Sequence, residues 1–391
     1  MKDGNLSGCE FSIRGNDMSI VSDQDIYAYA MEVISNITDD LANSKYRDPG
    51  AALSVRWSGV EEFNASAPLS PVIRQSPEHV IIIHYALARQ LYRDAENFVT
   101  FTEDPKTLGF VKKFPKEYMP LPLLPTEFSR ESCIKNIFLA SLTWIYFHEL
   151  SHLNQEHGVV RADGCHLGVP SHADELEDKR EDLTLREALL WHTTELAADA
   201  EGTIRCMSEL HRHFAQGRGD DKSQTEPDLI AASYLLICGL SCVLYRFNGG
   251  ALKPADDYPQ GTHPNAIFRL EHIIRQICQA LIFIGETYKY KISSKEILRL
   301  SKQAADLGAY FTHFYLSNRS SDLSELVVRG IYERPEYRRY AQKIISTWDE
   351  IEPAIKANTR HPVRLGYLYF SDEYRNYNFG NGLSDEGKNN G

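Results

Sequence analysis

The sequence has no run of lysine and arginine residues, and its overall charge is acidic. It contains 42 Lys and Arg against 54 Asp and Glu, which leaves a formal net charge of −12 at pH 7. Proteins that bind nucleic acid usually present a basic patch to the phosphate backbone. Nucleic acid is therefore not an expected partner of this chain.

Cysteine is scarce and has no spacing typical of a disulfide framework. None of the seven cysteines forms a Cys-x-x-Cys pair, and they lie at Cys9, Cys133, Cys165, Cys206, Cys238, Cys242 and Cys278. Residues 1–20 carry charges throughout and lack the apolar core of a secretory signal. Scattered thiols without such a signal predict a reduced, cytoplasmic protein.

Long hydrophobic runs and nucleotide-binding motifs are also missing. The longest uncharged segment, Leu229–Tyr245, is diluted by Ser, Gly and Cys. It is shorter than the roughly 20 apolar residues that a membrane-spanning helix needs. We expect a buried core helix there, with membrane insertion as the alternative. The chain has no Gly-rich phosphate loop and no Gly-x-Ser-x-Gly sequence, so nothing supports nucleotide hydrolysis or serine esterase chemistry.

The residues that are present predict a mainly α fold of the α+β class. Apolar residues recur mostly at helical spacing, and strands at Ala52–Trp57 and Phe98–Thr102 predict a small N-terminal sheet. Ser76-Pro77-Glu78 predicts the start of a helix reaching about Phe98, although Val80–Ile83 is a β-branched run that a strand would favour. Further helices are predicted at 23–43, 131–157, 184–213 with a Thr-x-x-Glu capping box, 226–247, 264–288, 294–317, 322–332 and 335–351.

Two of the 14 histidines, His148 and His152, stand four residues apart, and Glu149 follows the first. On a helix these histidines share one face, so both imidazoles reach one Zn²⁺ ion. Glu149 then lies where a general base can reach a water molecule. Because apolar residues of the predicted 131–157 helix give it a buried side, the site would be held rigidly. The pattern predicts metal-assisted hydrolysis.

A catalytic zinc ion needs a third protein ligand. Gly158 stands where the last histidine of an HExxHxxGxxH pattern would fall, so this ligand must come from another segment. Glu195 is the candidate, and Asp199 lies one helical turn later. Asp199 would accept a hydrogen bond from a ligand imidazole and fix its tautomer. His192 shares the same face and is the reserve ligand or a polar wall residue. An ordinary exposed acid pair is the alternative reading of these two carboxylates.

A third element is the segment Thr262-His263-Pro264-Asn265. If Pro264 is the first residue of the next helix, His263 occupies the N-cap. From a helix end an imidazole can project into a cleft and stabilise the oxyanion of a hydrolytic reaction. A simple capping role for His263 is the alternative.

Taken in order, HELSH, ELAAD and THPNAIFR resemble the HExxH, ExxxD and HPxxxxR series of the gluzincin zinc endopeptidases, of the CAAX-prenyl-protease and HtpX type. The resemblance implies a helical, zincin-like metallopeptidase core. By this resemblance, His148, His152 and Glu195 would be the zinc ligands. Glu149 would be the base, and Asp199, His263 and Arg269 would be the supporting residues.

The resemblance covers only about Ile134–Ile274, and the membrane helices of those enzymes have no clear counterpart here. The HExxH motif alone is also similar to that of the Lit-type phage-exclusion peptidases. We therefore expect a mixed α/β region at 1–125, a helical zinc-peptidase core at 126–290, a C-terminal helical region at 291–370 and a disordered tail at 371–391.

The function predicted from these motifs is that of a soluble zinc-dependent endopeptidase acting on a protein or peptide. Two alternatives stay open. One is a non-catalytic interaction or regulatory protein on a metallopeptidase-like scaffold, and the other is a membrane-associated peptidase.

Overall fold

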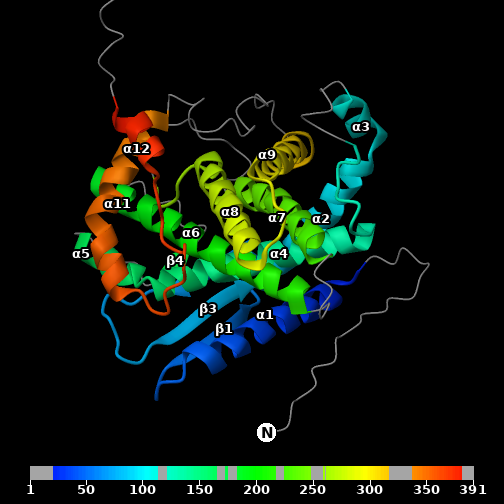
Figure 1. The fold of residues 1–391 in the computed structure, drawn as a ribbon. Helices are drawn as coiled ribbons and strands as arrows, with labels where there is room; N and C mark the ends of the chain where they lie inside the picture. The colour runs from blue at the N-terminus through cyan, green and yellow to red at the C-terminus, as the bar shows by residue number, and fades with distance from the viewer. Residues whose placement is uncertain are drawn as a thin grey trace, which may run out of the picture.

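A small sheet and a body of packed helices make up the described part of the chain, a computed structural model (Figure 1). The structure describes residues 21–112, 121–164, 172–174, 183–216, 224–247, 259, 261–316 and 337–380. Helices dominate these residues, and the sheet lies at one end of the helical body, beside the first helix (Figure 1). The prediction of a mainly α fold with a small sheet is confirmed.

The sheet has four strands in the order β1-β3-β2-β4. Its strands are β1 (Ala52–Ser58), β2 (Ala65–Pro68), β3 (Glu78–His84) and β4 (His172–Asp174). β1 pairs parallel with β3, whereas β2 pairs antiparallel with both β3 and β4. β4 therefore joins the outer edge of β2 although it lies about a hundred residues further along the chain.

The prediction of a helix beginning at Ser76 is wrong, because the segment first forms β3. The β-branched run Val80–Ile83 buries alternate side chains in the sheet, which a strand does better than a helix. The helix α2 begins only at Tyr85 and runs to Glu103. The predicted strand Phe98–Thr102 is also wrong, since it is the last part of α2 and packs into the helical core.

The central helix is α4 (Arg130–Asn154), which is buried almost all round from Ile137 onward. It begins at the N-cap Ser129, whose side chain accepts a hydrogen bond from the Ser132 amide. The predicted helix 131–157 is too long at its C-terminus. Glu156 has a left-handed φ of 52°, which ends α4 and starts the short helix α5 (His157–Gly164) in a new direction. The helices α1 (Asp23–Lys45) and α3 (Pro105–Val111) complete the N-terminal part.

The long helix α6 (Leu185–Gln216) lies beside α4 and opens with the predicted capping box. The Thr184 amide donates to Glu187 Oε2 over 2.8 Å, and the Glu187 amide donates to Thr184 Oγ1 over 3.3 Å. Two backbone donors at the helix start are thus satisfied by side chains.

The uncharged run Leu229–Tyr245 belongs to α7 (Thr225–Phe247). α7 is long and apolar enough to cross a membrane by length and composition, but 94% of its most apolar window is buried inside the fold. It packs between α4, α8 and α9. The burial is that of a core helix of the protein itself.

The next helices are α8 (Ala266–Tyr288) and α9 (Ser294–Phe311), followed by a π-helical turn at Thr312–Leu316. The N-cap of α8 is Asn265, whose side chain accepts from the Ile267 amide, and not His263. The predicted N-cap was wrong because asparagine competes well for this position, so the helix starts two residues later.

The C-terminal part contains α11 (Arg338–Asn358) and α12 (Asp372–Phe379). The expected disordered tail from 371 is wrong as far as 379. Ser371 caps α12, and Tyr374 is buried in a cluster with residues of α6 and α11. The predicted helix 322–332 and residues 381–391 lie outside the described residues.

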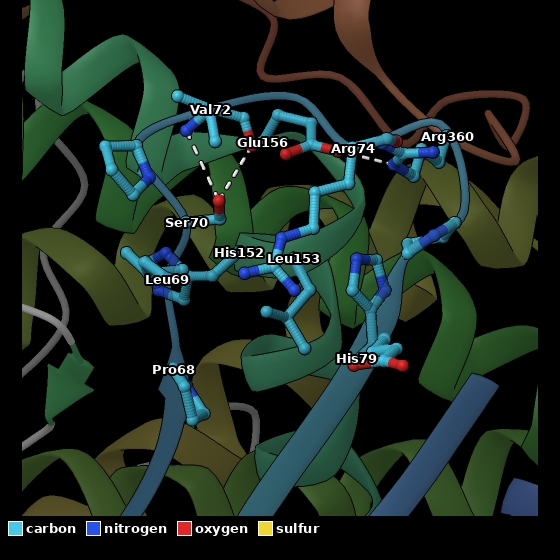
Figure 2. A pocket seen from close by; sticks show the side chains of 14 residues that line it. Pro68, Leu69, Ser70, Val72, Arg74, His79, His152, Leu153, Glu156 and Arg360 are labelled. Atoms are coloured by element: carbon cyan, nitrogen blue, oxygen red, sulfur yellow. Dashed lines mark hydrogen bonds and ion pairs between the residues drawn. The ribbon is translucent and has the colours of Figure 1, made fainter. Parts of the chain in front are cut away.

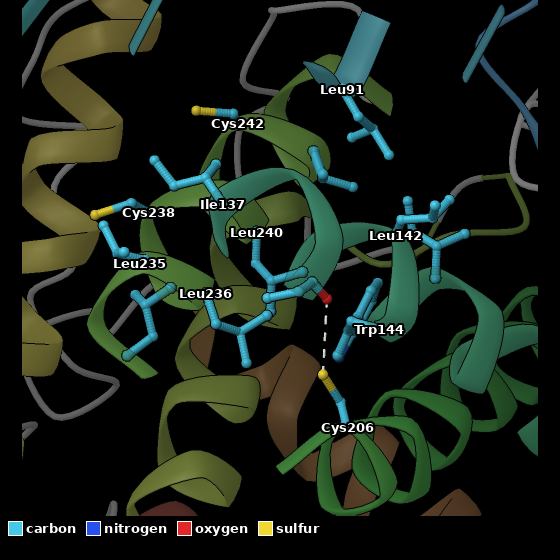
Figure 3. Close-up of a cluster of buried hydrophobic side chains, with 14 of the residues drawn as sticks. Leu91, Ile137, Leu142, Trp144, Cys206, Leu235, Leu236, Cys238, Leu240 and Cys242 are labelled. Carbon is cyan, nitrogen blue, oxygen red and sulfur yellow. Dashed lines mark hydrogen bonds between the residues drawn. The ribbon is translucent and has the colours of Figure 1, made fainter. Parts of the chain in front are cut away.

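The core between α4, α6 and α7 is filled by closely packed side chains. Figure 3 shows Ile137 of α4 among leucine and cysteine side chains of α7, and Trp144 of α4 beside Cys206 of α6. At the α4–α6 contact, Gly202 of α6 has no side chain and packs directly against the backbone of His148 in α4. A Cβ on Gly202 would lie 2.9 Å from the backbone nitrogen of His148, which is closer than the Cβ atom of a real side chain comes to a neighbouring atom. The glycine therefore sets the spacing of the two helices.

We expect Gly202→Ala to destabilise the protein by about 1–2 kcal/mol. The extra methyl group meets backbone rather than a flexible side chain, and such overpacking costs about 1–3 kcal/mol. The higher helix propensity of alanine returns at most about 1 kcal/mol. Urea unfolding followed by circular dichroism measures the change.

The matched control is Gly109→Ala in α3, where an added Cβ has nothing within 4 Å. This variant should be as stable as the wild type or slightly more stable. Equal stability changes in the two variants would contradict the role assigned to Gly202.

Candidate metal centre

The last two turns of α4 and the middle of α6 face each other in the interior and carry five buried polar residues. His148, Glu149 and His152 come from α4, and Glu195 and Asp199 come from α6. Each of these five residues is at most 1% exposed. Buried ionisable groups persist only when they are paired or bind a metal ion, so the cluster needs a physical explanation.

His148, His152 and Glu195 form a triangle of potential ligand atoms. The two Nε2 atoms are 3.1 Å apart. His148 Nε2 lies 3.2 Å from Glu195 Oε2, and His152 Nε2 lies 3.4 Å from Glu195 Oε1. Ligand atoms about 2.0–2.1 Å from a tetrahedral zinc ion are about 3.3–3.4 Å apart. The three side chains therefore lie close to the spacing of zinc ligands.

The ring nitrogen of His148 that faces away from the triangle, Nδ1, contacts a buried ion pair. His148 Nδ1 lies 2.9 Å from Asp199 Oδ1, and Arg269 of α8 donates to both Asp199 oxygens over 2.9 and 2.8 Å. Burial raises the pKa of Asp199, but Arg269 and His148 more than offset this and hold it below its usual value. An ionised Asp199 requires the His148 proton on Nδ1, which leaves the Nε2 lone pair for a ligand bond.

The ring nitrogen of His152 that faces away from the triangle, Nδ1, contacts a residue that the sequence analysis did not assign to the site. His157, the first residue of α5, places its Nδ1 2.8 Å from His152 Nδ1. Burial lowers the pKa of His152 to about 4, so this imidazole is neutral near pH 7. A neutral imidazole is the form that binds a metal ion.

The electrostatics of the triangle favour a bound cation. With both Nδ1 atoms turned outward, the Nε2 lone pairs of His148 and His152 face each other and the Glu195 carboxylate. Lone pairs and a negative charge converging in a dry interior repel one another, and a divalent cation removes that repulsion. The buried group can thus bind a metal ion.

Arg161, on α5, braces the carboxylate of the triangle and was not predicted either. Its Nη2 donates to Glu195 Oε1 over 2.8 Å, and its Nε donates to Thr194 Oγ1 over 2.9 Å. The guanidinium stacks 3.8 Å from the Trp191 ring centroid and is fully buried. Since His157 and Arg161 lie one turn apart on α5, this short helix contacts two ligands. Their spacing is visible in the sequence, but the turn at Glu156 that aims them inward is not.

Two other predicted site residues lie further from the triangle. His263 Nε2 is 3.7 Å from Glu195 Oε2, at the border of the cluster rather than inside it. His192 hydrogen-bonds through Nδ1 to the Tyr340 hydroxyl of α11, over 2.8 Å. His192 is not among the grouped ligand atoms, so it serves contact with α11 rather than the reserve ligand role.

A cavity of about 250 Å³ reaches His152 from the sheet side. The segment from Pro68 to Arg74 borders it on one side and His79 of β3 on the other (Figure 2). Leu153 and Glu156 form the wall that belongs to the end of α4. The cavity therefore adjoins the metal triangle at one of its three ligands.

We expect the purified protein to bind one equivalent of Zn²⁺ and Glu195→Gln to bind it much more weakly. An amide removes the negative charge and a strong oxygen ligand, so the loss should exceed the roughly 10–100-fold typical of outer partners. Competition with a chromophoric chelator measures both affinities.

Glu209→Gln is the matched control, because Glu209 lies on the same helix and pairs only with Arg212 in the described contacts. It should leave the affinity for Zn²⁺ unchanged. Wild-type affinity in Glu195→Gln would exclude Glu195 as a ligand.

Comparison of the chain with protein-family models, curated proteins and solved structures finds no match.

Proposed function

We propose that the protein is a zinc-dependent endopeptidase that hydrolyses peptide bonds of a protein substrate. The observation that carries the proposal is the convergence of two imidazole lone pairs and one carboxylate at zinc-ligand spacing, with the buried Glu149 following His148 in α4. Two histidines and one glutamate leave a fourth position for water or substrate, as a catalytic zinc site requires.

The residues around the triangle would share the chemistry. Zinc, when bound, supplies Lewis acidity and lowers the pKa of water. Glu149 takes the proton from the attacking water and passes it to the leaving amine. His263, next to Glu195, is placed to donate a hydrogen bond to the oxyanion. Asp199, Arg269 and Arg161 hold the ligands in position.

Access to the site is consistent with an extended peptide approaching along the sheet. The cavity beside His152 is bordered by the end of β2 and by His79 of β3. Extended peptides commonly bind proteins by adding a strand to a sheet edge. Of the two strands predicted from the sequence, Phe98–Thr102 is helical, whereas β1 lies at one edge of the sheet.

The deep burial of the triangle favours a second candidate, a closed structural metal site in a non-catalytic protein. Structural zinc sites have four protein ligands and no open position. The group found among the described residues has three. Glu149, fully buried and next to His148 in the sequence, would have no task in a structural site. The peptidase is therefore the better-supported proposal.

The proposal extends to the location of the protein, its partners and its relation to membranes. We propose a cytoplasmic protein without a nucleic-acid partner, on the acidic charge and the scattered thiols. The burial of α7 supports a core helix over the membrane-associated peptidase.

We expect Glu149→Gln to abolish peptide hydrolysis while zinc stays bound. The amide cannot accept the proton of water, and loss of a general base lowers the rate by about 10²–10⁴-fold. The zinc content should not change, because Glu149 is not one of the three ligands. Turnover of a cleaved protein substrate and metal analysis of the same sample give the two readouts.

Glu209→Gln is again the control and should keep both activity and zinc. Full activity in Glu149→Gln would contradict the mechanism. Zinc with no open coordination position, together with no hydrolysis by the wild type, would favour the structural site.

A further inference from the structure

His152 carries its proton on one of two ring nitrogens, and only one tautomer leaves Nε2 free for a metal ion. The chain of hydrogen bonds behind His152 determines which tautomer forms. It runs through His157 and Gln155 to Glu201 of α6. All four residues are buried, so water does not compete for these bonds.

The orientation of the Gln155 amide is fixed by the chemistry of its neighbours. Its Nε2 lies 2.8 Å from Glu201 Oε2 and 3.2 Å from the carbonyl oxygen of Ala197. Both of these atoms are acceptors, so the amide nitrogen must face them. Gln155 Oε1 is then the atom that faces His157.

The Gln155 oxygen in turn fixes the proton of His157. His157 Nε2 lies 3.1 Å from Gln155 Oε1 and must donate, since the oxygen only accepts. His157 is fully buried and neither of its described hydrogen-bond partners is a carboxylate, so the ring is neutral and has a single N–H. His157 Nδ1 therefore presents a lone pair to His152.

His152 must then carry its proton on Nδ1, which lies 2.8 Å from that lone pair. The other tautomer would set two lone pairs against each other at this distance and lose a buried hydrogen bond. The remaining lone pair of His152 is on Nε2, the atom that faces His148 and Glu195.

We propose that His157 is a positioning residue that holds His152 in the Nδ1-protonated tautomer and so prepares Nε2 to bind the metal ion. This inference rests on the metal site of the proposed function. Gln155 and Glu201 hold His157 in turn, and Glu201 is itself anchored by Arg205, which donates to Oε1 over 2.6 Å.

The turn that carries His157 is held from a distant part of the chain. Glu156 has the left-handed φ of 52°, a conformation that is strained for a non-glycine residue. Arg360 compensates by pairing with the Glu156 carboxylate and by donating its backbone amide to the Asn154 carbonyl over 2.7 Å. The packing of the C-terminal segment thus keeps His157 behind His152.

The test is the zinc affinity of two substitutions at His157, measured by chelator competition on folded protein. His157→Phe keeps a ring but removes the acceptor, and should bind zinc roughly 10–100-fold more weakly, as expected when an outer partner of a ligand histidine is lost. His157→Asn offers its side-chain oxygen near the position of Nδ1 and should recover most of the affinity. If His157→Phe does not fold, His157→Leu replaces it.

His272→Phe is the matched control for replacing a buried histidine. His272 lies in α8 and donates from Nδ1 to the Phe268 carbonyl, and it has no described hydrogen bond to any of the three ligands. It should bind zinc like the wild type even if it is less stable.

The outcomes separate the inference from the proposed function. Wild-type affinity in His157→Phe, or equal losses in the Phe and Asn variants, would overturn the tautomer role while leaving the metal site intact. Failure of the wild-type protein to bind zinc would overturn the metal site of the proposed function, and the inference with it.

Discussion

The site depends on the close approach of α4 and α6. Because Gly202 has no side chain, the two helix backbones pack closely enough for the carboxylates of α6 to reach the imidazoles of α4. This close packing also buries lone pairs and charges that repel one another. A metal ion at the centre of the triangle relieves that repulsion, so packing and chemistry are linked at one contact.

Each ligand is also held from outside by a neighbour. Arg269 of α8 acts on His148 through Asp199, and α5 supplies His157 to His152 and Arg161 to Glu195. These contacts fix ring tautomers and carboxylate orientation before a metal ion arrives. Ligands that are already oriented lose little conformational entropy on binding, which raises affinity.

Local sequence spacing predicted the features that depend on a single helix. The HExxH and ExxxD motifs place their residues on one helix face whatever the rest of the fold does, and the structure brings Glu195 to the two histidines. The parts that failed depend on contacts between distant segments. Val80–Ile83 is a strand because the sheet surrounds it, and the aim of His157 and Arg161 depends on a turn at Glu156 that Arg360 stabilises.

The most direct test of the central claim is X-ray absorption at the zinc edge of the metal-loaded protein. The account predicts two imidazole nitrogens, one carboxylate oxygen and one exchangeable water oxygen, all about 2.0–2.2 Å from the ion. Scattering from sulfur at about 2.3 Å, or four protein ligands with no water, would contradict a catalytic centre built from His148, His152 and Glu195.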